Sequence, residues 1–405
     1  MLKGFKYRLY PTDAQAELIN KHIGSCRFVY NLALECKQMA YAGSKVNLTC
    51  FDLIKQLPDL KKECEWLKEV NSQSLQQSIV NLDVAYNSFF KGRMDFPNFK
   101  KKGYNQSFHV PQNVLIVGNK LIIPKFKKGI EIVLHREYTG TIRQATISKT
   151  PTGKYFVSLL IETSDTIPAK APITESSTIG IDLGIKTFIV GSNGEAFDNP
   201  KFLRKTISKL KYIQCKYSKY RGKRTRKELA LLYELVANQR KDFLHKTSTR
   251  LIRENQSIVI EDLNIKGMTA RCKPVQDETG RYLPNGQSRK SGLNRAITDA
   301  SWGMLVTMLE YKAEWYGRNI LRIGRFDPSS KTCHACGSIN KKLTLEDREW
   351  TCRCGVVLDR DVNAAINIKT FALKKHLSAE HRLENRNELP TLVGVLTSEA
   401  PIPLG

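Results

Sequence analysis

Apolar and polar residues alternate in two separate parts of the N-terminal half. Three apolar side chains alternate with polar ones over residues 1–10, which indicates a half-buried strand. The alternation returns from about residue 95 to 165, where apolar runs flank a Gly-Asn turn at 118–119 and a Pro-Thr-Gly turn at 151–153. We therefore predict a small β-barrel-like module, and the first strand can pair with it from the far side of the intervening segment.

That intervening segment has the spacing of helices. Pro11 and Thr12 precede Gln15, and the three residues from Thr12 to Gln15 are the spacing of a capping box. Helical patterning continues to about Lys91. The stretch 71–90 places five apolar residues near one face, namely Leu75, Ile79, Leu82, Val84 and Tyr86. It leaves three glutamines free for polar contacts, namely Gln73, Gln76 and Gln77.

The C-terminal half mixes the two periods. Strand-like apolar runs cover residues 177–190, 257–261 and 319–325, and helical spacing covers residues 201–254 and 299–316. A loop rich in Gly and Arg lies between the second strand and the last of these helices, and a cysteine-rich segment and a final helix end the fold. Mixed elements in this order predict an α/β layer fold. The tail is polar with several prolines, so we expect residues 376–405 to be disordered.

Asp182 lies between two glycines in an apolar strand segment. Because side chains alternate along a strand, Gly180, Asp182 and Gly184 share one face, and Ile181 and Leu183 share the other. A buried acid needs a partner. The missing side chains beside it would leave room for metal ions and a phosphate. An acid that merely caps a turn is the alternative for this segment alone.

Two later acids have similar settings. Glu261 ends a buried strand and points opposite to Ile258 and Ile260. Asp359 is placed to be the N-cap of the final helix, and Asp361 falls in its first turn. Acids in a first turn often interact only with the helix dipole, and this alternative applies to Asp359 more than to Asp361.

Together Asp182, Glu261 and Asp361 predict one carboxylate cluster that holds two magnesium ions roughly 3.5–4 Å apart. In such a site one ion activates the attacking water and the other stabilises the leaving oxygen. Three converging carboxylates repel one another without cations, so we expect the metals to be part of the folded site.

Four of the ten cysteines lie within 22 residues. Cys333 and Cys336 form one pair, and Cys352 and Cys354 form a second pair that is one residue tighter than the usual zinc knuckle. A glycine follows each pair, as tight metal turns require. We predict a structural zinc site with no catalytic role, because four thiolates leave no open position.

The chain carries 65 Lys and Arg against 39 Asp and Glu, a net charge of +26. Such a surplus is typical of proteins that neutralise phosphates, although anionic lipid or a solvated basic surface is an alternative. The candidate contacts are Lys100, Lys101, Lys102, Lys216, Lys219, Arg221, Lys223 and Arg224. The sequence has no run of eighteen apolar residues and no apolar leader, so we expect a cytoplasmic protein without membrane contact.

Several segments in order resemble one family. GIDLGIKTF, IVIEDLNIKGM, SSKTCHACG and WTCRCGVVLDRDVNAAINI are similar to the signatures of transposon-encoded TnpB nucleases, relatives of type V CRISPR effectors. The segments FKYRLYPT, RFVYNLAL and ASWGMLVTMLEYKAEWYGR match as well. The resemblance covers nearly the whole chain to about residue 375.

The resemblance implies a domain plan. It implies an RNase H-like RuvC domain at 177–328 and 358–375, interrupted by a zinc ribbon at 329–357. It also implies a wedge β-barrel at 1–10 and 94–170, with a helical recognition block inserted at 11–93.

The resemblance also implies the activity. It implies that a guide RNA from the transposon end directs cutting of double-stranded DNA beside a short transposon-adjacent motif, by a monomeric ribonucleoprotein. The family's three acids fall on Asp182, Glu261 and Asp361, and its motif-reading positions fall on Gln76 and Gln77. A nuclease-inactive repressor and a guide-free transposase are the alternatives, but no acid is missing and the cysteine module between Glu261 and Asp361 does not fit a transposase.

Overall fold

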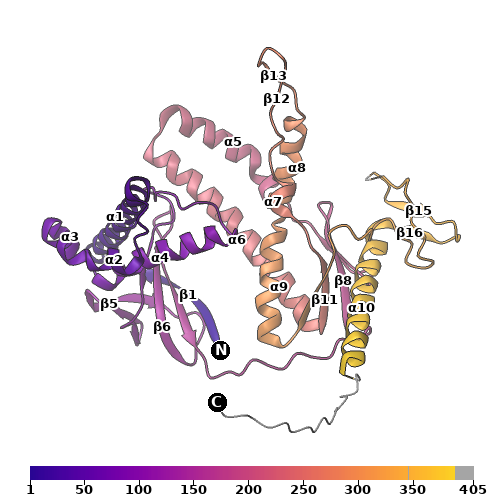
Figure 1. The fold of residues 1–405 in the computed structure, drawn as a ribbon, viewed down its shortest axis with the longest axis horizontal. Helices are drawn as coiled ribbons and strands as arrows, with labels where there is room; N and C mark the ends of the chain where they lie inside the picture. Colours follow the sequence, from indigo (N-terminus) through magenta and orange to yellow (C-terminus); the bar gives the residue numbers. More distant parts are fainter. Residues whose placement is uncertain (345, 388–405) are drawn as a thin grey trace, which may run out of the picture. The chain divides into compact units, whose positions relative to one another are not determined.

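The computed structural model describes residues 1–344 and 346–387, and the chain divides into two compact units. The first unit comprises Met1–Thr166 and Tyr212–Glu234, and the second comprises Ile167–Lys211 and Leu235–Gly405. Figure 1 traces the elements of both. Within the described residues, every helix is too short or too polar to cross a membrane.

The first unit contains one antiparallel sheet in the order β2-β6-β7-β1-β5-β4-β3. Its strands are β1 (Leu2–Tyr10), β2 (Ser107–Val110), β3 (Leu115–Val117), β4 (Lys120–Ile123), β5 (Phe126–Val133), β6 (Thr141–Lys149) and β7 (Tyr155–Glu162). β1 pairs with both β5 and β7, which confirms that the first strand joins the later ones. Among the described residues no ladder joins the edge strands β2 and β3, so hydrogen bonds leave the sheet open.

Helices fill the segment between β1 and β2. They are α1 (Asp13–Ser44), α2 (Cys50–Lys55), α3 (Leu57–Glu63), the 3-10 helix η1 (Glu65–Glu69) and α4 (Ser72–Phe90). The predicted capping box is confirmed, because Thr12 and Gln15 bond reciprocally at the start of α1. In α4 Leu75, Ile79 and Leu82 are buried as predicted.

Val84 corrects the predicted apolar face of α4. Its side chain is 57% exposed. At 3.6 residues per turn, Val84 lies about 200° around the helix from Leu82, so the two cannot face the same core.

The segment 201–254, which was predicted to be helical, folds as a hairpin of two long helices. They are α5 (Phe202–Tyr220) and α6 (Lys223–Glu254), joined at Arg221 and Gly222. Arg221 has a φ of 46°, in the left-handed region that allows the chain to reverse there. Residues of the hairpin tip, Tyr212–Glu234, belong to the first unit.

The second unit is built on a five-stranded sheet in the order β10-β9-β8-β11-β14. The strands are β8 (Thr178–Leu183), β9 (Thr187–Gly191), β10 (Ala196–Asp198), β11 (Ser257–Glu261) and β14 (Asn319–Ile323). β8, β11 and β14 run parallel, whereas β9 and β10 are antiparallel. Ile258 and Ile260 pack into one core cluster and Val259 packs into another, so both faces of β11 are covered.

Helices cover the two faces of this sheet. They and the short elements near them are α7 (Ile265–Met268), β12 (Val275–Gln276), β13 (Tyr282–Leu283), α8 (Gln287–Ala300), α9 (Trp302–Tyr316), β15 (Glu349–Thr351), β16 (Val357–Asp359) and α10 (Arg360–Asn387). α9 supplies Leu305 and Leu309 to the core with Ile258, whereas Ile368 of α10 packs with Val259 on the other face. Figure 1 shows α10 running alongside β8 and β11.

Three boundary predictions in this unit are wrong. The expected strand at 177–190 is the hairpin of β8 and β9, because Gly184 allows a turn in which its N–H bonds Phe188 O. The expected loop before residue 299 contains α8, which forms because it buries Ile297 and Ala300. The expected disordered tail begins too early, since α10 runs to Asn387 through residues of good helix propensity. Residues 388–405 lie outside the described part.

Candidate active site

Asp182 and Glu261 end neighbouring parallel strands. β11 pairs with β8 so that Ser257 lies beside Thr178 and Val259 lies beside Gly180. Continuing this register by two residues places Glu261 beside Asp182. Gly180 and Val259 both contact α10, so the two acids also point to the side of the sheet that α10 covers.

Gly180 brings α10 very close to β8. A Cβ atom at this position would lie 2.2 Å from Ala365 O and 2.7 Å from Lys369 N. The sequence predicted that Gly180 leaves room beside Asp182 for metal ions and phosphate. This prediction is wrong, because the backbone of α10 fills the space at Gly180. At Gly184 the space is filled by the turn, where a Cβ would lie 2.4 Å from Thr187 O.

Asp361 completes the group from the first turn of α10. Asp361 lies one helical turn before Ala365 in α10, and Asp182 is the next residue after Gly180 on the same face of β8. Because Gly180 contacts α10 at Ala365, this contact brings the two acids near each other. Arg348 Nη1 lies 3.2 Å from Asp361 Oδ2 and partly balances its charge.

Asp359 has a different role, which confirms the N-cap prediction. Its Oδ1 accepts hydrogen bonds from the backbone N–H groups of Asp361 at 3.0 Å and of Val362 at 2.8 Å. These bonds satisfy donors that a helix start leaves free. The carboxylate of Asp359 is thus engaged with the helix backbone, while that of Asp361 is not.

The electrostatics of Asp182 show that the charges of Glu261 and Asp361 act on it. Burial is the first cause that raises the pKa of Asp182 to about 7, followed by the charges of Glu261 and Asp361. Arg360 opposes the rise without cancelling it. A divalent cation would relieve this excess of negative charge, so these residues fit the predicted metal site.

Among the described residues, the four cysteines form a compact group of possible metal ligands, whose sulfur atoms all lie within 4.8 Å of one another.

Sequence reasoning missed a neighbour of Glu261. Ser329 Oγ donates a hydrogen bond of 2.6 Å to Glu261 Oε1. It also missed Arg348 and Arg360, whose charges act on Asp361 and Asp182. No periodic signal points to these residues, because they contact the acids only through the tertiary fold.

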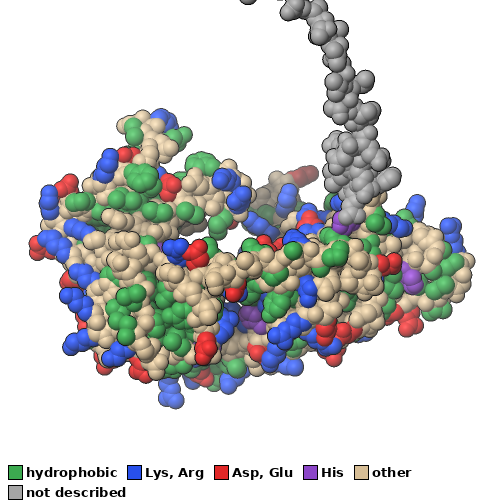
Figure 2. All heavy atoms as spheres, turned by 90° about the horizontal axis from the view of Figure 1, so that it is seen from below, with side chains coloured by type: hydrophobic (Ala, Val, Ile, Leu, Met, Phe, Trp, Pro, Cys, Tyr) green, Lys and Arg blue, Asp and Glu red, His purple; other side chains and the backbone are tan. Residues whose placement is uncertain are grey.

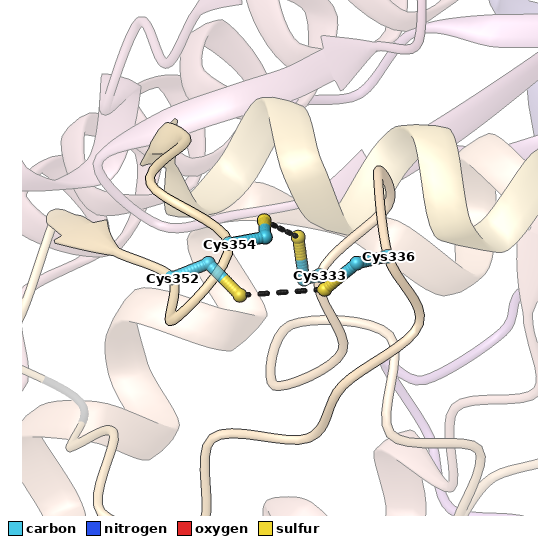
Figure 3. A group of neighbouring side chains, drawn as sticks. All are labelled: Cys333, Cys336, Cys352 and Cys354. Carbon is cyan, nitrogen blue, oxygen red and sulfur yellow. Dashed lines mark hydrogen bonds between the residues drawn. The ribbon is translucent and has the colours of Figure 1, made fainter.

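The four cysteines converge as predicted (Figure 3). Cys333 Sγ lies 3.9 Å from Cys354 Sγ, and Cys336 Sγ lies 3.5 Å from Cys352 Sγ. Tetrahedral zinc with Zn–S bonds of about 2.3 Å places sulfurs roughly 3.8 Å apart. These separations exceed a disulfide bond and fit four thiolates around one zinc ion.

Glycines close both cysteine turns. Gly337 has a φ of 74° and Gly355 has a φ of 88°. The N–H of Gly337 donates to the carbonyl oxygen of Cys333, and the N–H of Gly355 donates to the carbonyl oxygen of Cys352. The tight second pair therefore still forms a closed turn.

The candidate nucleic-acid residues are surface side chains. Gln76 and all eight basic candidates are exposed, whereas Gln77 is half-buried and donates to Asn81 Oδ1 at 3.2 Å. Lys100 Nζ lies 3.8 Å from the centre of the Tyr30 ring. Lys and Arg side chains are spread across the face drawn in Figure 2. Gln76 and the eight basic side chains are therefore accessible to a partner, whereas Gln77 is partly engaged within its own helix.

Models of known families match three segments. One described as a Cas12f1-like TNB domain matches residues 302–368, which include the cysteine cluster and Asp361. One described as a probable transposase, of the OrfB type of IS605, matches residues 158–271, which include Asp182 and Glu261. One described as a helix-turn-helix domain matches residues 1–45, which fold here as β1 and the single helix α1.

One solved structure shares the fold. A Cas12f1 chain determined by cryo-EM with sgRNA and target DNA superposes with a TM-score of 0.56 at 14% identity, over 88% of this chain and 83% of that one. The likeness shows that the two chains share a mixed α/β multidomain fold.

Curated relatives span almost the full length. A Streptomyces pristinaespiralis protein named "Putative RNA-guided DNA endonuclease" is 39% identical over 382 residues, covering 92% of this chain and 89% of that protein. Escherichia coli InsQ, which carries the same description, is 32% identical over 378 residues and 91% of both chains. A mimivirus relative at 23% identity is named TnpB-like protein L79. These matches show that the chain belongs to the transposon-encoded TnpB family of RNA-guided DNA endonucleases.

Proposed function

We propose that this protein is an RNA-guided endonuclease that cuts double-stranded DNA beside a short transposon-adjacent motif. The observation that carries the proposal is the convergence of Asp182, Glu261 and Asp361 at one edge of the parallel sheet, where burial and then the charges of the other two acids raise the pKa of Asp182. The printed names of the Streptomyces pristinaespiralis and Escherichia coli relatives support the guided activity.

In this proposal Asp182, Glu261 and Asp361 hold two magnesium ions. Bound divalent cations supply activation of the attacking water and stabilisation of the leaving oxygen. The chain places the acids: β8 and β11 fix two of them on rigid neighbouring strands, and Gly180 fixes the helix that carries the third. Asp359 contributes by holding the first turn of α10 in shape.

We assign the remaining parts by the family plan. The second unit's five-stranded sheet with α10 is the RuvC-like nuclease domain, and residues 329–357 are a zinc ribbon with a structural ion on the four cysteines. The seven-stranded sheet is the wedge domain, with α1 to α4 as the inserted recognition block. The order of elements supports this plan, because α1 to α4 interrupt strands that pair with each other.

The basic surface supports nucleic-acid partners. A net charge of +26 favours phosphate contact by counterion release. We propose that the guide RNA and target DNA contact Lys100, Lys101, Lys102, Lys216, Lys219, Arg221, Lys223 and Arg224, and that Gln76 and Gln77 lie near the adjacent motif. Base pairing with the guide would then select the target, and the protein would read only the short motif.

The test begins with the protein expressed beside its native flanking DNA. Any RNA that co-purifies is sequenced. The complex is then incubated with magnesium and a library of DNA duplexes, each of which carries a target that matches the RNA and, next to the target, a short randomised sequence. We expect a transposon-end RNA and cutting that depends on both the match and one short motif. Bound RNA without cutting would instead indicate a repressor, and absence of RNA would indicate a guide-free enzyme.

A further inference from the structure

A buried serine contacts one of the three acids. Ser329 lies in the turn that follows β14, and β14 is paired with β11 so that Ile323 lies beside Glu261. The turn folds back at Asp327, whose Oδ2 accepts the N–H of Gly324 at 2.7 Å. This reversal brings Ser329 Oγ to 2.6 Å from Glu261 Oε1. Ser329 is only 4% exposed, so little water reaches its hydroxyl group.

The helix that carries the third acid holds this turn. Asn367 of α10 donates its side-chain amide to Ser329 O at 2.8 Å and to Thr332 O at 2.6 Å. Asn363, one turn earlier, donates to Thr332 O at 2.8 Å and accepts the N–H of His334 at 3.0 Å. Both asparagines are buried, so their amides take the place of water for the carbonyls of the turn.

The same turn leads directly into the cysteine cluster. Cys333 follows Thr332, and its N–H bonds Ser338 O at 2.8 Å within the first knuckle. Hydrogen bonds of Asn363 and Asn367 therefore connect the segment that leads into the first cysteine pair with Ser329, and Ser329 in turn donates to the carboxylate of Glu261. A hydroxyl that donates to one carboxylate oxygen fixes the rotation of that carboxylate and leaves the other oxygen free for a ligand.

We propose that Ser329 is a positioning residue for the nuclease reaction, which orients the Glu261 carboxylate toward the divalent cations. The proposal rests on the proposed function, because it takes Glu261 to be a metal ligand. Ser329 itself contacts neither metal nor substrate. It acts through Glu261, and the first cysteine pair and α10 keep it in place.

The test compares Ser329→Ala with Ser329→Thr, which keeps the hydroxyl. Ser330→Ala is the matched control, because Ser330 is the next residue and is half-buried. Manganese binding to the RNA-bound protein is measured by calorimetry without target DNA, together with the magnesium concentration that gives half-maximal cutting. Thermal midpoint and zinc content are measured for every variant.

We expect Ser329→Ala to bind manganese about 10-fold more weakly and to need correspondingly more magnesium. Its thermal midpoint, zinc content and target binding should stay close to those of the wild type. Ser329→Thr should restore most of the cation affinity, and Ser330→Ala should not change it.

Glu261→Ala separates the two ways in which the proposal can fail. If Glu261→Ala weakens manganese binding but Ser329→Ala does not, the positioning role is wrong and the proposed function stands. If Glu261→Ala leaves manganese binding unchanged, Glu261 is not a ligand, and both ideas fall together. If Ser329→Thr binds as weakly as Ser329→Ala, the effect comes from packing and the positioning role is again wrong.

Discussion

At the residue scale, the two neighbouring acids at the start of α10 separate a capping role from a metal-binding role. Asp359 bonds two backbone N–H groups, whereas Asp361 faces an arginine and acts on Asp182. We expect Asp361→Asn to lower the magnesium-dependent cutting rate at least about 100-fold, since it removes a charged ligand.

Asp359→Asn is the matched control for this prediction. Asparagine caps helices about as well as aspartate, so the cutting rate should stay within a few-fold of the wild type. Guided cleavage assays at saturating RNA measure both. A severe loss in Asp359→Asn with cutting retained in Asp361→Asn would reverse the assignment.

The raised pKa of Asp182 predicts a pH dependence of stability in magnesium-free buffer. The folded-state pKa of about 7 exceeds the ordinary value of 3.8, so the folded protein holds the proton more tightly than the unfolded chain. The free energy of unfolding should therefore fall as pH rises from about 4 to 7. The difference between the two pKa values sets an upper limit of about 4 kcal/mol on this fall in unfolding free energy. We expect a smaller fall, because the side chain is only half-buried and solvent screens its charge.

Asp182→Asn checks this sign, because asparagine does not titrate. Urea unfolding midpoints of the variant should change less than those of the wild type between pH 4 and 7, so that the variant is relatively more stable at pH 8. Magnesium should stabilise the wild type at pH 8 and affect the variant less. Parallel pH curves for the two proteins would contradict the prediction.

At the element scale, Gly180 sets the contact between β8 and α10. Gly180→Ala would place a methyl group against the backbone at Ala365 and Lys369, and backbone cannot move aside as a flexible side chain can. We expect a loss of about 1–3 kcal/mol in unfolding free energy, together with slower cutting because Asp361 is displaced with the helix.

Gly4→Ala is the control for this substitution. Gly4 also lies in a strand, β1, but a Cβ there would meet nothing within 4 Å. Urea unfolding and cleavage rates should stay close to those of the wild type. Equal effects of the two substitutions would show that close packing at Gly180 is not what matters.

At the scale of the whole molecule, the surplus of positive charge predicts a strong salt dependence of RNA binding. Replacing the basic residues near the tip of the α5 and α6 hairpin with alanine should flatten the plot of log affinity against log salt. These residues are Lys216, Lys219, Arg221, Lys223 and Arg224. The slope should fall by roughly 0.7 for each phosphate contact that is lost to a single strand.

Lysines that are already paired provide the control. Lys62 lies 2.7 Å from Asp59, and Lys68 lies 3.0 Å from Glu65. Changing both to alanine should leave the slope nearly unchanged, because their charge is already balanced. Affinities for the co-purified RNA across a range of potassium chloride concentrations measure the slope. An unchanged slope for the hairpin variant would remove that surface from the RNA-binding site.

What the sequence determined by itself was local. The alternation over residues 1–10, the capping box at Thr12, the N-cap at Asp359 and the spacing of the four cysteines each depend on neighbours a few positions away, and the structure confirms them. These features follow from backbone geometry and capping energetics that a short segment already contains.

What only the tertiary structure decided was contact between distant segments. The sequence placed two glycines beside Asp182, but their use by α10 and by a turn depends on residues that the chain brings there from elsewhere. The residues around Ser329 do not indicate its role, because its partner Glu261 lies 68 positions earlier in the chain. α8 forms in a segment with loop-like composition because it buries Ile297 in the core. In each case packing between distant segments outweighs local propensity, and such packing is fixed only when the whole chain is folded.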